Sequence, residues 1–153
     1  MASQAIVRKA DILGCWKLVE AMEERGGVVH TNPNYGKNPT GFLHYLAEDR
    51  VAVVVSLAGR KLLSGGDRRK APDEELAEAA RSFDAYAGTF ALLGDGHVSH
   101  RIEISTFQND VGKDLVRRME LTGDRLTLHI PLFSDKDQVV KRHLTWERVL
   151  PTK

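Results

Sequence analysis

Hydrophobic side chains recur at every second position along most of the chain, the pattern of β-strands that turn one face toward a core. Short polar connections that contain Gly and Asp, such as Gly94-Asp95-Gly96 and Thr122-Gly123-Asp124, separate several of these segments and suit tight turns. The pattern predicts an all-β, antiparallel sheet. We expect strands over residues 14–22, 28–31, 41–46, 50–57, 90–93, 97–107, 115–121, 125–130 and 139–149.

Residues 72–86 follow a different pattern, with apolar side chains at steps of three and four. This spacing predicts one amphipathic helix over residues 72–86, with Pro72 at its first position and Gly88 as the residue that terminates it. A sheet of this length exposes its edges unless it closes on itself. We therefore predict an up-and-down barrel of about eight to nine strands with one helix inserted between strands.

The chain has 153 residues, which fits a single domain over residues 1–153. Lys and Arg number 22 and Asp and Glu number 21, so the net charge is only +1. This balance indicates neither a nucleic-acid-binding protein nor one that binds an anionic membrane. The partner we expect is a small molecule, with a homo-oligomer left open.

Cys15 is the one cysteine, so no internal disulfide is possible and a reducing cytoplasm is the expected location. The first nine residues lack the features of a secretory signal peptide. We expect no metal, because the six histidines show no ligand spacing. We expect no cofactor either, because the sequence contains no nucleotide-binding glycine motif.

Several short motifs, taken in order, resemble the bacterial and fungal lipocalin-like domain family. They include Gly14-Cys15-Trp16 near the start, Gly123-Asp124-Arg125-Leu126 later in the chain and Trp146-Glu147-Arg148 near the end. The resemblance implies a barrel with a central cavity. It also implies that Trp16 plugs one end while Arg148 packs over the indole as a cation–π pair.

Two polar side chains have the parity of the predicted interior. His100 has the same parity as Val98 and Ile102, so it lies on the same face of its strand, and the resemblance also places a His at this position. Arg117 has the same parity as Met119 on the next strand. A buried guanidinium there needs a carboxylate, carbonyls or an anionic ligand as its partner. Both have structural alternatives: His100 as a satisfied core histidine, and Arg117 as an arginine that reaches water or pairs with an acid such as Glu20.

The remaining candidates would line the cavity. The resemblance favours Leu43 and Tyr45 pointing inward, and Tyr86 could cap the cavity from the predicted helix or simply pack that helix against the barrel. In total, the candidate catalytic residues are His100 and Arg117, and the candidate ligand-binding residues are Tyr45, Tyr86, Leu43, Ile102, Met119 and Trp146.

Two functions therefore compete. The first is an intracellular barrel that binds a small, mostly apolar, oxygen-bearing molecule. The second is a cofactor-independent lyase, dehydratase, isomerase or cyclase, in which His100 moves a proton while Arg117 and a tyrosine stabilise an oxyanion. An interaction module with a filled interior and an α+β cone fold remain further alternatives.

Overall fold

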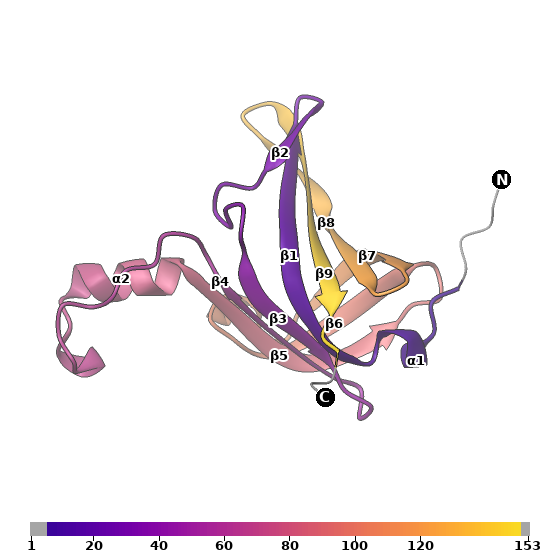
Figure 1. The fold of residues 1–153 in the computed structure, drawn as a ribbon, viewed down its shortest axis with the longest axis horizontal. Coiled ribbons are helices and arrows are strands. Elements are labelled where there is room, and N and C mark those ends of the chain that lie inside the picture. The colour runs from indigo at the N-terminus through magenta and orange to yellow at the C-terminus, as the bar shows by residue number, and fades with distance from the viewer. Residues whose placement is uncertain (1–5, 151–153) are drawn as a thin grey trace.

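The computed structural model describes residues 6–150, and its sheet confirms the predicted all-β, antiparallel class. Eight strands close into a barrel and β2 is an extra strand paired to β1 (Figure 1). The order is β2-β1-β3-β4-β5-β6-β7-β8-β9, and pairing of β1 with β9 closes the ring. The strands are β1 (Gly14–Arg25), β2 (Val28–Thr31), β3 (Thr40–Tyr45), β4 (Arg50–Ser56), β5 (Phe83–Leu92), β6 (His97–Ser105), β7 (Asp114–Thr122), β8 (Arg125–Asp135) and β9 (Gln138–Arg148).

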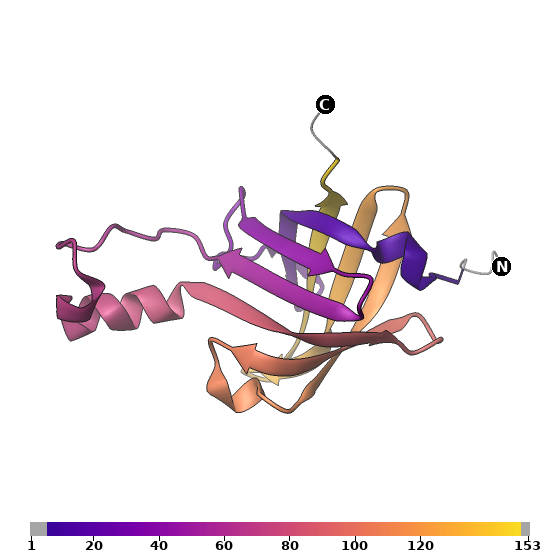
Figure 2. The same ribbon diagram turned by 90° about the horizontal axis from the view of Figure 1, so that it is seen from below.

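Helix α2 (Asp73–Arg81) is shorter than predicted, and it extends away from the barrel with the loop before it (Figures 1 and 2). It ends where Ser82 N–H and Ser82 Oγ–H both donate to the Glu78 carbonyl. The assignment of Tyr86 to this helix is wrong, because β5 begins at Phe83 and Tyr86 pairs with Val53 of β4. Tyr86, Gly88 and Phe90 also recur at every second position, so sheet pairing overrides the local helical spacing.

The two faces of β1 exchange roles part-way along the strand. Trp16 and Leu18 are buried as expected, but the register with β9 shifts between Leu18 and Glu20. This bulge adds one residue, so the alternation continues on the opposite parity. Beyond it Ala21 and Glu23 are buried, whereas Met22, which shares the parity of Trp16 and Leu18, is only partly buried.

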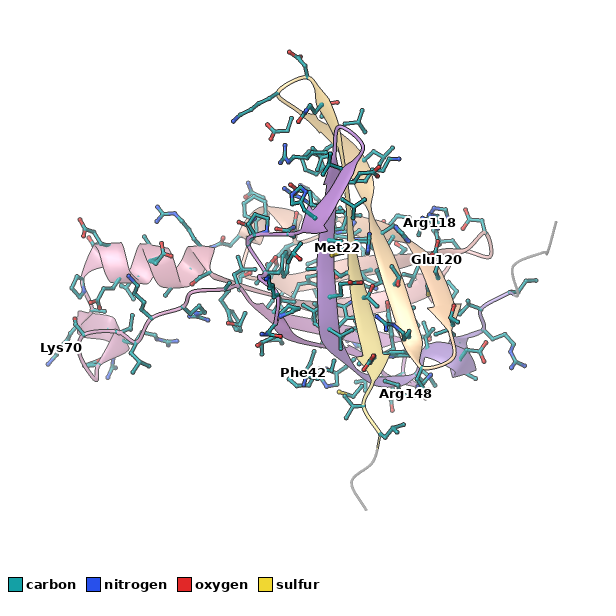
Figure 3. All side chains as sticks on the ribbon, turned by 45° about the horizontal axis from the view of Figure 1, so that its top comes forward. Met22, Phe42, Lys70, Arg118, Glu120 and Arg148 are labelled. Atoms are coloured by element: carbon teal, nitrogen blue, oxygen red, sulfur yellow. The ribbon has the colours of Figure 1, made fainter. Side chains whose placement is uncertain are left out.

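Helix α1 (Lys9–Ile12) closes one end of the barrel. Ile12 is completely buried, and its carbonyl accepts a hydrogen bond from Trp16 Nε1 at 2.8 Å. The Arg148 guanidinium lies 4.3 Å from the Trp16 ring centroid and donates to the carbonyls of Asp11 and Leu13 (Arg148 is labelled in Figure 3). This end is therefore sealed by side chains and by satisfied backbone groups.

Gly88 lies at a bulge between β5 and β6, not at the end of a helix. A Cβ added there would lie 1.8 Å from the Arg101 carbonyl oxygen. We expect Gly88→Ala to lower the free energy of unfolding by about 2 kcal/mol, because the backbone must move to relieve the clash. Urea denaturation measures this loss. Gly65→Ala is the matched control, since no atom lies within 4 Å of the corresponding Cβ, and equal losses for both variants would contradict the prediction.

Candidate ligand-binding site

A cavity of about 120 Å³ lies inside the barrel, away from the end that α1 closes. A closed apolar cavity of about 150 Å³ can hold a benzene molecule, so this smaller space is close to the size of one small ring. Half of the lining side chains are aliphatic, and the polar groups come from a few of the others. The lining residues are Tyr35, Val53, Val55, Asp84, Tyr86, Arg117, Leu128, Ile130, Leu144 and Trp146.

Three aromatic side chains behind the cavity form one hydrogen-bonded chain, Tyr45–His100–Tyr86. The Tyr45 hydroxyl lies 2.8 Å from His100 Nε2, and the Tyr86 hydroxyl lies 2.7 Å from His100 Nδ1. The sheet brings them together from β3, β6 and β5. Tyr45 and His100 are completely buried, whereas Tyr86 is half-buried and reaches the cavity wall.

Burial sets the protonation of this chain. Desolvation, together with the charge of Arg117, lowers the pKa of His100 to about 3. Burial likewise raises the pKa of Tyr45 and of Tyr86 above the ordinary value for a tyrosine. At neutral pH the imidazole is therefore uncharged and both tyrosines keep their protons.

Arg117 brings a positive charge to the cavity wall. Its guanidinium donates to the Val116 carbonyl at 3.2 Å, and no carboxylate within residues 6–150 lies at ion-pair distance from it. The predicted alternative partner, Glu20, is exposed on β1. Asp84 also lines the cavity, and its carboxylate accepts a hydrogen bond from Thr106 Oγ1 at 3.0 Å.

Trp146 lines the cavity, and its one polar atom is buried beneath the cavity surface. The side chain is almost fully buried, yet its indole Nε1–H has no hydrogen-bond partner in the described part of the chain. An indole nitrogen can only donate, so the unpaired group is a donor. Buried donors without an acceptor are uncommon in folded proteins.

Comparison with known proteins identifies the fold. The lipocalin-like domain family matches residues 13–149, which is most of the chain. The chain belongs to the lipocalin-like domain family. The expected family resemblance is thereby confirmed, and the barrel described above is a lipocalin-like barrel.

One relative of this lipocalin-like chain is the 4'-hydroxy-3'-methoxypropiophenone carrier protein of Aspergillus oryzae (strain ATCC 42149 / RIB 40). The two are 32% identical over 101 residues, which cover 60% of this chain and 84% of the relative. No solved structure matches the chain.

The lipocalin-like barrel brings only some of the predicted site residues to the cavity. Tyr86, Arg117 and Trp146 line it directly. His100 and Tyr45 lie behind the wall and reach the cavity through Tyr86. The other predicted ligand contacts are buried in the core but do not line this cavity: Leu43, Ile102 and Met119.

Two polar residues of the cavity were not predicted from the sequence. Tyr35 comes from the loop between β2 and β3, whose Pro, Asn and Gly residues indicate only a turn. Asp84 shares the parity of Tyr86, a signal that becomes visible only when Phe83–Leu92 is assigned as a strand. Both positions depend on how distant segments close the barrel.

Among residues 6–150, no three His, Cys, Asp or Glu side chains are grouped closely enough to hold a metal ion. No helix within that range is both long and apolar enough to span a lipid bilayer.

Proposed function

We propose that this lipocalin-like barrel binds a small, mostly apolar molecule that carries an oxygen function, with the ligand in the cavity lined by Tyr86, Arg117 and Trp146. The cavity itself carries the proposal: aliphatic side chains from β4, β8 and β9 surround a small group of polar atoms. Such a combination of apolar lining and few convergent polar groups is the usual form of a small-molecule site. The carrier name of the Aspergillus oryzae relative supports the same function.

The chemistry of His100 favours binding over the enzyme alternative. An acid–base catalyst works best with a pKa near the operating pH and within reach of the substrate. Burial instead lowers the pKa of His100 to about 3, and both ring nitrogens are engaged by tyrosine hydroxyls.

The half-buried, unpaired Cys15 is consistent with the reducing, cytoplasmic location that we propose for the protein.

Binding of 4'-hydroxy-3'-methoxypropiophenone tests the proposal. We expect saturable one-to-one binding by isothermal titration calorimetry, and no product by mass spectrometry after prolonged incubation. Val53→Phe places a ring in the cavity and should weaken binding at least about tenfold, because the ligand and the new ring compete for the same space.

Val54→Phe is the matched control for the cavity-filling variant. Val54 is 40% exposed and its neighbour Val53 is 8% exposed, so the added ring lies outside the barrel. We expect near-normal affinity for Val54→Phe. Equal affinities for the two variants would place the ligand elsewhere, and formation of a product would favour the enzyme.

A further inference from the structure

We propose that the cavity selects a neutral hydrogen-bond acceptor, the carbonyl oxygen of a small ketone, and that the Tyr45–His100–Tyr86 chain enforces this choice by turning the Tyr86 hydroxyl proton toward the cavity. The proposal rests on the proposed binding function and adds the chemical class of ligand. It follows from which group donates and which accepts in each hydrogen bond of the Tyr45–His100–Tyr86 chain.

The Tyr45 hydroxyl has a single hydrogen-bond partner in the described part of the chain. Its side chain is completely buried, and within residues 6–150 its hydroxyl hydrogen-bonds only to His100 Nε2. A Tyr45 proton that pointed anywhere else would be unpaired in the core, at a substantial cost. Tyr45 therefore donates, and His100 Nε2 accepts.

The proton on His100 is then fixed as well. A neutral imidazole carries one N–H and one acceptor nitrogen. Since Nε2 accepts from Tyr45, the single proton is on Nδ1, which donates to the Tyr86 hydroxyl oxygen at 2.7 Å. The hydroxyl proton of Tyr86 is consequently not used by His100, and the Tyr86 side chain lines the cavity.

Arg117 also lines the cavity. Its guanidinium, which uses one donor on the Val116 carbonyl, has further N–H groups that can only donate. Two side chains with donor capacity, Tyr86 and Arg117, therefore line one small space. A ligand oxygen that accepts hydrogen bonds would satisfy them, whereas an alkane would leave them unpaired.

The charges in the wall favour a neutral acceptor over an anion. Asp84 lines the same cavity as Arg117 and opposes its positive charge. A carboxylate ligand would gain from Arg117 and lose against Asp84. A ketone oxygen accepts hydrogen bonds from the donors without adding a charge. An alcohol also carries a hydroxyl proton, which would need an acceptor of its own in the cavity.

A series of ligands with one phenyl ring tests this selectivity. The probes are propiophenone, 1-phenylpropan-1-ol, propylbenzene and phenylacetate, each titrated by calorimetry. We expect propiophenone to bind about tenfold more tightly than any of the other three. In Tyr86→Phe, propiophenone affinity should fall toward that of propylbenzene, while propylbenzene affinity changes little.

The position of the His100 proton is measured separately. In protein with ¹⁵N-labelled histidine, the imidazole nitrogen shifts should show Nδ1 protonated and Nε2 unprotonated. This readout needs no ligand, and a purely structural role of His100 would allow either tautomer. The Tyr45→Phe variant removes the donor to Nε2 and should abolish the single-tautomer signal.

The outcomes separate the two levels of the argument. If neither the four probes nor 4'-hydroxy-3'-methoxypropiophenone binds, both the binding function and the ketone preference are wrong. If they bind with equal affinity, or if phenylacetate binds most tightly, the ketone preference alone is overturned. An Nε2-protonated His100 would overturn the role assigned to the Tyr45–His100–Tyr86 chain.

Discussion

Acidification below about pH 6.5 is expected to destabilise the protein steeply through His100 alone. An unfolded histidine takes up a proton near pH 6.5, whereas burial and Arg117 lower the pKa of folded His100 to about 3. Between these values the unfolded chain binds one more proton than the folded chain. The free energy of unfolding therefore rises with pH across this window, by about 1.4 kcal/mol for each pH unit. Above about pH 6.5, His100 adds no further pH dependence.

Urea denaturation of wild type and His100→Gln measures this effect. From about pH 7.5 to pH 4.5, the wild type should lose about 2.5 kcal/mol more of its free energy of unfolding than the variant does. The variant is expected to be less stable at neutral pH, because it loses the hydrogen bonds to Tyr45 and Tyr86. Comparison of slopes removes that offset, together with the contributions of the other titrating groups. Parallel profiles would show that His100 titrates normally in the folded protein.

Loss of the Arg148 guanidinium is expected to open the sealed end of the barrel. The group donates to the Asp11 carbonyl at 2.6 Å and to the Leu13 carbonyl at 2.8 Å, and it stacks on Trp16. Arg148→Met keeps an apolar stem but leaves both carbonyls without this donor. We expect the free energy of unfolding to fall by about 3 kcal/mol.

Arg125→Met provides the matched control for charge. Arg125 is exposed, and its contact with Glu147 is a 3.8 Å surface ion pair. Its removal should cost less than about 1 kcal/mol, because water screens such pairs. Thermal or urea denaturation compares the two variants under one set of conditions. A similar small loss for Arg148→Met would show that α1 and Trp16 close the barrel without the guanidinium.

Much of the barrel could be predicted because strand alternation is a local property. In β6 the parity of the segment places His100 inside, as the structure does. In β3 the parity puts Leu43 and Tyr45 on one face, which the family resemblance assigned to the interior, and the structure agrees. The prediction was wrong where a neighbouring strand decides the conformation. Residues 83–86 satisfy both a helical and an alternating pattern, and only pairing with β4 makes them a strand. The bulge in β1 likewise depends on β9, so the change of parity after Leu18 could not be predicted.

The candidate site, like the barrel, was predictable from the sequence only in part. The sequence by itself determined an antiparallel barrel, and it placed a histidine and an arginine on inward parities, because the period of a strand is set by its own backbone. Only the tertiary structure decided that Tyr45 and Tyr86 hold the two nitrogens of His100, and that Tyr35 and Asp84 join Arg117 at the cavity. The two hydrogen bonds to His100 link residues up to 55 positions apart. Their geometry depends on barrel closure, register and bulges, which no local pattern contains.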